Sequence, residues 1–261
     1  MIGAIIGDIA GSKFEFCNYR SKKFKIFSQD SFITDDSVMT LAVAQAVYMC
    51  KGDYSFLSGF AKASMQMLGQ MYPSSGYGTS FYNWIFSDYP LPYNSYGNGA
   101  AMRVSACGFY GKTLKEVKKM SKAVTEVSHN HPEGLKGAEA TAVCIFLAKS
   151  GKSKKYIRNY VNKNYYKLDF TIDGIRPTYD FNETCQRTVP QAIEAFLESE
   201  SFEDAIKTAV SVGGDSDTLA AITGSIAEAF YGVPADMRAK ALEYLDEDLL
   251  QIYNNVEIIL K

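Results

Sequence analysis

Apolar residues recur at helical spacing through most of the chain. After Ser37, for example, Val38, Leu41, Ala42 and Met49 fall on one face of a helix. The segment that starts at residue 219 repeats this spacing. The pattern predicts an all-α fold, with further helices over residues 56–71, 97–110, 114–125, 134–148, 154–164, 190–197, 202–212 and 235–245.

Two segments interrupt the helical pattern. Residues 72–78 are rich in Gly, Ser and Pro, and residues 164–184 show no helical period. Within the second segment, residues 168–172 alternate weakly between polar and apolar, which predicts a strand or an extended crossing segment. The segment carries too many aromatic and aliphatic residues for a flexible linker, and no repeat flanks it. We therefore expect one compact domain over residues 1–261.

The first predicted helix carries glycines at every fourth position. Gly3, Gly7 and Gly11 would form a smooth face that another backbone can approach closely, and Glu15 continues this face. Such a helix is expected to be buried. Its polar residues, Asp8 among them, then need partners, because burial of an unpaired carboxylate is costly. They point to a polar site in the interior.

Charge and cysteine content exclude several classes of protein. With 27 Lys and Arg residues against 29 Asp and Glu residues, the chain has no positive excess to bind a run of phosphates. Nucleic acid is therefore an improbable partner, except as a modified substrate. The five cysteines are scattered and never form a Cys-x-x-Cys pair, which favours a reducing cytoplasm. No apolar stretch has the length of about 20 residues that a membrane span needs.

Two acidic clusters stand at the starts of predicted helices. A single such residue is enough to cap a helix, but neighbouring carboxylates repel each other unless a positive charge lies among them. Oxygen ligands without thiolates suit Mg²⁺ or Mn²⁺. Capping and metal binding both remain open from the residues alone. The clusters are Thr34, Asp35 and Asp36 in the first case, and Asp215, Asp217 and Thr218 in the second.

Two glycine-containing segments could receive an anion. Residues 97–103 place small residues at a loop-to-helix junction, where free amides favour phosphate, although such residues are equally common in ordinary caps. Arg103 could contact a ligand or be a surface charge. The two histidines, His129 and His131, lack the further ligands that zinc needs, so they fit substrate contact or a loop position. No serine nucleophile motif, P-loop or dinucleotide fingerprint is present.

The order of these motifs resembles the ADP-ribosylglycohydrolase family. The resemblance spans nearly the whole chain. It is carried by Gly7-Asp8-Ile9-Ala10-Gly11-Ser12 with Glu15, Thr34-Asp35-Asp36-Ser37, Gly76-Tyr77-Gly78, the segment from Gly97 to Arg103, the His129 loop, and Gly213-Gly214-Asp215-Ser216-Asp217-Thr218.

The resemblance implies a compact orthogonal helical bundle with a central cleft for two divalent cations, Mg²⁺ or Mn²⁺. Each acidic cluster would bind the cations from one side, and Glu15 would be the catalytic carboxylate beside the scissile bond. Tyr77 and Gly78 would contact the nucleotide. The ADP-ribose phosphates and distal ribose would be held by Asn98, Gly99, Ala100, Met102 and His129.

The activity implied is metal-dependent hydrolysis of the glycosidic bond between ADP-ribose and an acceptor. The acceptor would be a protein side chain or a small molecule, and the sequence does not identify it. The cations would orient the ribose and activate the attacking water. Two other roles remain open: a non-catalytic, crystallin-like structural or ADP-ribose-binding relative, and a metal-dependent phosphohydrolase.

Overall fold

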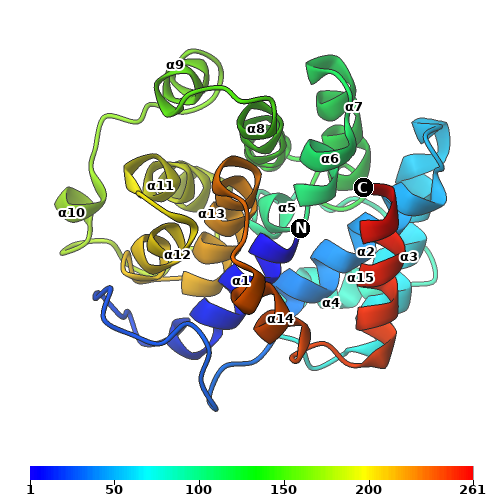
Figure 1. Cartoon of the computed structure of the whole chain (residues 1–261). Coiled ribbons are helices and arrows are strands. Elements are labelled where there is room, and N and C mark those ends of the chain that lie inside the picture. Colours follow the sequence, from blue (N-terminus) through cyan, green and yellow to red (C-terminus); the bar gives the residue numbers. More distant parts are fainter. Residues whose placement is uncertain (261) are drawn as a thin grey trace.

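Helices make up nearly all the regular structure of the computed structural model, which describes residues 1–260 (Figure 1). No β-strand occurs in this range, so the all-α prediction is confirmed. The helices are α1 (Ile2–Gly11), η1 (Ser12–Phe14), α2 (Asp35–Met49), η2 (Tyr54–Phe56), α3 (Leu57–Met71), α4 (Thr79–Ile85), α5 (Gly99–Met102), α6 (Ser105–Tyr110), α7 (Leu114–Thr125), α8 (Pro132–Lys149), α9 (Lys154–Asn164), α10 (Ile172–Ile175), α11 (Cys185–Glu198), α12 (Phe202–Val210), α13 (Ser216–Tyr231), α14 (Ala235–Leu242) and α15 (Glu247–Leu260).

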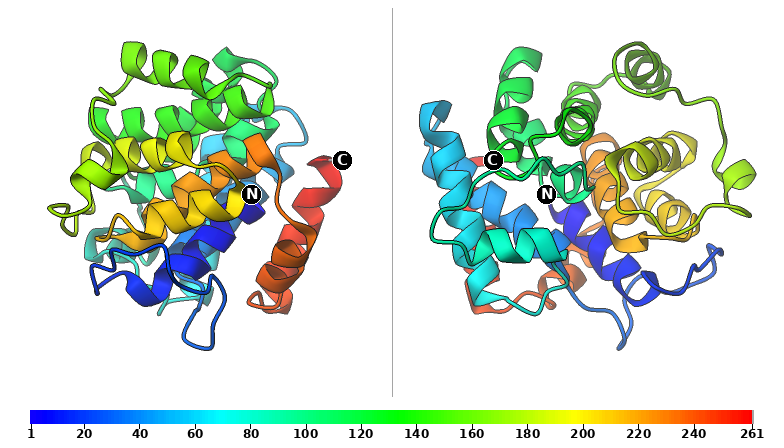
Figure 2. Two further views of the ribbon diagram at one scale, coloured as in Figure 1. Left: turned by 60° about the vertical axis from the view of Figure 1, so that its left-hand side comes forward. Right: turned by 180° about the vertical axis from the view of Figure 1, so that it is seen from behind.

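The buried first helix is confirmed, and its glycines pack against α13. A β-carbon on Gly3 would lie 2.2 Å from the Gly224 carbonyl oxygen, and one on Gly11 would lie 2.4 Å from Asp217 Cα. Every residue of α1 is buried. Figures 1 and 2 show α1 and α13 side by side at the centre of the molecule. This close approach brings the end of α1 next to the start of α13.

The other helices enclose this central pair. α2 packs against α1 and carries α3 and α15 on its outer side, while α8 packs against α6, α7, α11 and α13. Buried apolar side chains from α1 to α15 form one continuous core. No helix in residues 1–260 is both long and apolar enough to cross a membrane.

The predicted helix over residues 97–110 is wrong as a single element. It consists of α5 and α6, and the interruption lies at Arg103 and Val104. The Met102 carbonyl oxygen accepts a hydrogen bond from Thr40 Oγ1 on α2 (3.2 Å), so a tertiary contact holds the end of α5. The break turns the Arg103 side chain into the interior, where it is fully buried.

The segment after α9 forms no strand. The Leu168 amide donates to Asn162 Oδ1 (2.8 Å) and the Ile172 amide donates to Glu198 Oε1 (2.9 Å), so side chains replace a strand partner. The segment runs around the outside of the bundle through α10 (Figure 2). It returns to the centre at Thr184, which forms an isolated antiparallel bridge with Gly97.

Other helix boundaries also differ from the prediction. α4 and α15 were not predicted, and α11 begins at Cys185, five residues before the expected start, with Pro190 inside the helix. Glu15 does not continue α1 as a regular helical turn, because α1 ends at Gly11 and the tighter helix η1 follows. Glu15 still lies in αR conformation directly after η1, close to the start of α13.

Candidate active site and metal centre

A cleft of about 660 Å³ lies where the starts of α2 and α13 meet the segment after α1. This volume is within the range of roughly 300–1,000 Å³ typical of small-molecule sites. Four other parts of the chain complete the wall. The lining includes Glu15, Asp35, Asp36, Asp215, Asp217 and Thr218, together with residues from segments 76–81, 93–103 and 181–184, and His129.

Asp8 on α1 fixes the start of α2. Its buried carboxylate accepts hydrogen bonds from the Thr34 amide (2.9 Å), the Thr34 hydroxyl (2.8 Å) and the Ser37 amide (3.0 Å), and also from the Ser37 hydroxyl. Burial raises the pKa of Asp8 to about 6, although these donors act in the opposite direction. Asp8 is therefore paired, as expected for a buried carboxylate, and its partners are Thr34 and Ser37, which flank Asp35 and Asp36 in the sequence.

A pair of glycines sets the start of α13. Gly213 and Gly214 have φ angles of 83° and 68°, which side chains with a β-carbon rarely adopt. The Gly214 amide donates to Asn18 Oδ1 (2.8 Å), and the Ser216 hydroxyl donates to the Gly11 carbonyl oxygen (2.9 Å). The turn is thus tied to the segment that carries Glu15, and it directs the second acidic cluster into the cleft.

Helix capping explains Thr34 but not the carboxylates. The Thr34 hydroxyl accepts a hydrogen bond from the Asp36 amide (3.3 Å), so the start of α2 is capped without Asp35 or Asp36. Asp215 holds the N-cap position of α13, yet its side chain makes no capping hydrogen bond. Instead, Asp215 Oδ2 accepts a hydrogen bond from Asn98 Nδ2 (2.6 Å). Asp217 Oδ1 does accept a first-turn amide, that of Thr218 (2.9 Å), so capping accounts for one of its oxygens but not for the grouping of the carboxylates.

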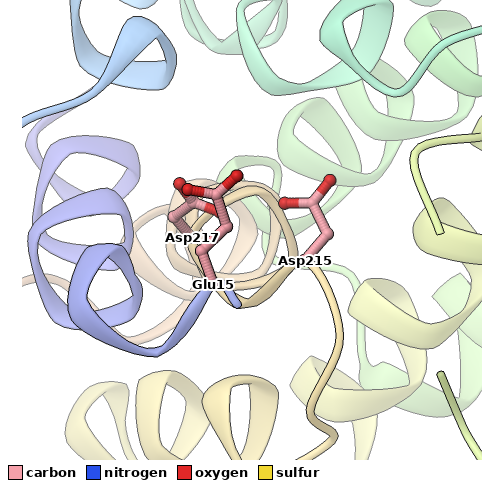
Figure 3. Close-up of side chains that lie close together, drawn as sticks. All are labelled: Glu15, Asp215 and Asp217. Atoms are coloured by element: carbon pink, nitrogen blue, oxygen red, sulfur yellow. The ribbon is translucent and has the colours of Figure 1, made fainter. Parts of the chain in front are cut away.

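The two acidic clusters meet in space. Thr218 Oγ1 donates to Asp36 Oδ2 across the cleft floor (3.0 Å). One carboxylate oxygen from each of Glu15, Asp215 and Asp217 lies within 4.8 Å of the others, and the three groups project to the same side (Figure 3). From here on, "the acidic cluster" means the combined set of Glu15, Asp35, Asp36, Asp215 and Asp217.

Burial and mutual repulsion disfavour the charged form of these carboxyl groups. Burial and the neighbouring carboxylates raise the pKa values of Asp35, Asp36 and Asp217 well above their usual range. Partial burial, followed by the charge of Asp215, raises the pKa of Glu15 to about 7. A group of positive charge in the cleft would remove this cost.

The donor set fits hard divalent cations. Asp36 Oδ1 is buried and has no hydrogen-bond partner among the described residues, so one carboxylate oxygen in the cluster remains free to bind a ligand. The groups around it supply carboxylate and hydroxyl oxygens, and the group formed by Glu15, Asp215 and Asp217 contains carboxylates alone. Mg²⁺ and Mn²⁺ prefer such ligands.

A second part of the cleft contains glycines and His129. Gly78, Asn98, Gly99, Met102 and His129, for which the sequence predicted substrate contacts, all line the wall. His131 fits the alternative considered for the histidines, a loop position. Its Nδ1 accepts a hydrogen bond from the Glu133 amide (3.1 Å) and caps α8. The surface position considered for Arg103 is wrong, since its side chain is fully buried where it borders the cleft.

Three predicted residues stand back from the wall of the cleft. The Thr34 hydroxyl is engaged with Asp8, Ala100 is buried in α5, and Tyr77 packs its half-buried ring 5.9 Å from that of Phe81. None of the three is among the residues that line the cleft. Their predicted contacts with a metal or substrate are therefore not visible in the cleft wall.

The sequence also missed part of the wall. Aromatic and polar side chains of two loops line the cleft without having been predicted, and only the high aromatic content of residues 164–184 distinguished one of these segments from a linker. The residues are Tyr93, Ser95, Tyr96, Phe181, Asn182, Glu183 and Thr184.

The fold and the cleft define an all-α protein with an acidic site suited to divalent cations. The family model for ADP-ribosylglycohydrolase matches residues 1–259, and the chain belongs to that family, whose members are glycosyl hydrolases. An ADP-ribosylhydrolase ARH3 from Gallus gallus is 23% identical, over 76% of this chain and 70% of the relative. The Homo sapiens ADP-ribosylhydrolase ARH3 is 25% identical, over 60% of this chain and 56% of the relative.

Solved structures show the same fold. The structure described as an "ADP-ribosylglycohydrolase-related protein complex" aligns with a TM-score of 0.72 and 19% sequence identity. The alignment covers 100% of this chain and 96% of the other. The arrangement of helices around the acidic cleft is thus shared with a solved member of this fold.

Proposed function

We propose that residues 1–261 act as one metal-dependent ADP-ribosylglycohydrolase domain that cleaves the glycosidic bond between ADP-ribose and an acceptor. The observation that carries this proposal is the convergence of five carboxyl groups on a cleft that also contains Gly99 and His129. Ligands with hydroxyls at one end and phosphates at the other would match the two parts of this cleft. ADP-ribose conjugates have this character, and the curated relatives are named ADP-ribosylhydrolases.

The acidic cluster is proposed to hold two divalent cations, Mg²⁺ or Mn²⁺. Thr34, Asp35 and Asp36 would act from α2, and Asp215, Asp217 and Thr218 from α13. When bound, the cations would supply positive charge to the ribose hydroxyls and to the attacking water. The free Asp36 Oδ1 and the raised pKa values of the cluster support this assignment.

Glu15 is proposed to move the proton in the reaction. Hydrolysis breaks the bond from the anomeric carbon to the acceptor, forms a bond to the water oxygen, and transfers a proton to the acceptor atom. Because the pKa of Glu15 is raised to about 7, this group can accept a proton from water or donate one near neutrality. Nearby dications would lower this pKa again and favour the base form.

The substrate-binding residues are proposed to be those of the second part of the cleft. Asn98, Gly99, Met102 and His129 would contact the phosphates and the distal ribose, and Gly78 would contact the nucleotide. Ala100 and Tyr77 would support them from behind, since neither lines the wall. The substrate is an ADP-ribosylated protein or a small ADP-ribose conjugate, and the proposed location is the cytoplasm.

The decisive experiment is release of ADP-ribose from a panel of conjugates on arginine, serine, O-acetyl and nucleic-acid acceptors, with Mg²⁺, Mn²⁺ or EDTA. Wild type is compared with Asp215→Ala, and with Asp88→Ala as a control at an exposed carboxylate. We expect metal-dependent release that Asp215→Ala abolishes and Asp88→Ala retains. The conjugate that is cleaved identifies the acceptor.

Other outcomes would contradict the proposal in different ways. Tight binding of ADP-ribose without turnover of any conjugate would indicate a binding or structural protein. Release of AMP would indicate attack on the pyrophosphate and a phosphohydrolase. Turnover that persists in EDTA would separate the catalytic reaction from the metal site.

A further inference from the structure

Arg103 is an unusual buried residue. Its side chain has no exposed surface, and no carboxylate of the described residues lies within ion-pair distance. Its guanidinium stacks over the Phe81 ring at 5.1 Å, and its Nε and Nη1 atoms lack hydrogen-bond partners in residues 1–260. A buried charge without a counter-ion is costly, so a positional requirement must offset this cost.

The one strong hydrogen bond of Arg103 begins a chain that leads to the cleft. Arg103 Nη2 donates to Ser128 Oγ (2.7 Å), and Ser128 Oγ lies 2.9 Å from His129 Nδ1. A guanidinium can only donate, so the serine hydroxyl accepts from Arg103 and keeps its own proton available for His129 Nδ1. Arg103 Nη2 itself lies 3.4 Å from the same ring nitrogen.

This arrangement determines the tautomer of His129. Arg103 Nη2 can only donate, and the Ser128 hydroxyl has a proton to give, so Nδ1 fits the acceptor role and the proton of the neutral ring fits Nε2. That nitrogen faces the glycine segment of the cleft, because β-carbons placed on Gly97 or Gly99 would each lie 3.6 Å from it. Burial, and then the charge of Arg103, lowers the pKa of His129 well below its usual range.

We propose that Arg103 is a positioning residue that acts through the Ser128 hydroxyl to hold His129 as the Nε2–H tautomer, a permanent hydrogen-bond donor to the substrate. This inference rests on the proposed function, which places the phosphates or distal ribose of ADP-ribose beside His129. Acceptor oxygens of either group match such a donor. Arg103 borders the cleft but has no exposed surface, so its proposed effect on the substrate passes through His129.

The tautomer can be observed directly by ¹⁵N NMR of the imidazole rings. The chain contains only His129 and His131, and His131→Asn keeps a good helix-capping residue while removing the second signal. We expect wild-type His129 to carry its proton on Nε2 and to remain neutral at pH values where a free imidazole is already protonated. The titratable side chains of residues 1–260 against this ring are Arg103 and Tyr93, and Phe81 packs nearby.

Arg103→Met tests the positioning role. We expect the second tautomer to appear, the pKa of His129 to rise toward its usual value, and the affinity for ADP-ribose to fall about tenfold, while the affinity for Mn²⁺ is unchanged. Arg103→Lys keeps the charge and a donor, so it should retain part of the Nε2–H population and part of the affinity for ADP-ribose. Ser128→Ala breaks the chain with a smaller change and serves if Arg103→Met does not fold.

A double-mutant cycle separates positioning from simple packing. In His129→Gln the amide nitrogen donates without any need for a fixed tautomer, so adding Arg103→Met should cost little further affinity. A proton on Nδ1 in the wild type, or an Arg103→Met protein with unchanged tautomer and affinity, would overturn the inference. These readouts need no turnover, so a failure to release ADP-ribose from any conjugate would overturn the proposed function alone.

Discussion

The two parts of the cleft differ in how complete they are without a ligand. In the acidic cluster, Asp36 retains a buried oxygen without a partner in residues 1–260, and burial together with the neighbouring carboxylates raises its pKa. In the second part, Arg103 Nη2, Ser128 and His129 form one directed hydrogen-bond chain, although Arg103 Nε and Nη1 lack partners in residues 1–260. The first part therefore needs a cation to reach its working state, whereas the second is organised in advance for an acceptor.

The largest effect is expected when the acidic cluster loses a charge. Asp217→Asn should lower kcat by on the order of 10³-fold and abolish high-affinity Mn²⁺ binding, because charge stabilisation at the reacting centre is lost. Its melting temperature in EDTA should stay level or rise, since one of several repelling carboxylates has been removed.

Steady-state kinetics and Mn²⁺ titration check this prediction, with Asp88→Asn as the exposed control. A variant that keeps both turnover and Mn²⁺ affinity would remove Asp217 from the metal site. A large loss of stability in EDTA would show instead that Asp217 supports the fold.

The next effect concerns the packing that carries the acidic cluster. Gly11→Ala would place a β-carbon 2.4 Å from Asp217 Cα, so α1 and α13 must separate. Overpacking of this kind costs about 1–3 kcal/mol of unfolding free energy. Because Asp217 would move with the start of α13, we also expect weaker Mn²⁺ binding. Chemical denaturation measures the loss of stability, and Mn²⁺ titration of the same samples measures the loss of binding.

Gly59→Ala is the matched control for this substitution. Gly59 lies in α3, is exposed, and would meet no atom within 4 Å of an added β-carbon. It should gain stability, by up to about 1 kcal/mol, from the better helix propensity of alanine. Equal effects of the two substitutions would contradict a role for Gly11 in close packing.

The same contrast explains how far sequence alone could go. The acidic cluster was predictable because Asp35 and Asp36, like Asp215 and Asp217, stand together in the sequence at helix starts, where local rules apply. The glycine face of α1 was predictable from a four-residue period. The sequence could not show that Thr218 would meet Asp36, because that contact joins helices far apart along the chain.

The second part of the cleft lacked such local signals. Arg103 and Ser128 are 25 residues apart and meet only because the helix expected over residues 97–110 is interrupted. Tyr93 and Glu183 reach the cleft on loops without hydrophobic periodicity. Tertiary contacts such as that of Thr40 with the Met102 carbonyl fix these loops, and no propensity of the segments themselves predicts them.

A smaller effect is expected from the preorganised part. His129→Ala should raise KM about tenfold with little change in kcat, because one hydrogen bond to the substrate is lost while the acidic cluster stays intact. Mn²⁺ affinity should not change. Initial rates over a range of substrate concentrations give both constants, and a kcat loss as large as that of Asp217→Asn would end the distinction between the two parts.

The smallest effect is a pH dependence of stability that metal should suppress. Carboxyl groups whose folded-state pKa is raised, such as Glu15 at about 7 and Asp8 at about 6, bind more protons in the folded than in the unfolded protein between about pH 4 and those values. The free energy of unfolding contributed by these groups therefore falls as pH rises through this range. In EDTA, the melting temperature should decrease between about pH 5 and pH 7.

Divalent cations should flatten this decrease, because they replace the protons that the carboxyl groups otherwise retain. His129 acts in the opposite sense, since its lowered pKa makes the unfolded chain the better proton acceptor below about pH 6.5. Melting curves in the His129→Gln background, with EDTA or Mn²⁺, isolate the acidic cluster. In that background, a melting temperature in EDTA that rises with pH would show that the protein already stabilises the charged carboxylates. The acidic part of the cleft would then need a cation no more than the part around His129 needs a ligand.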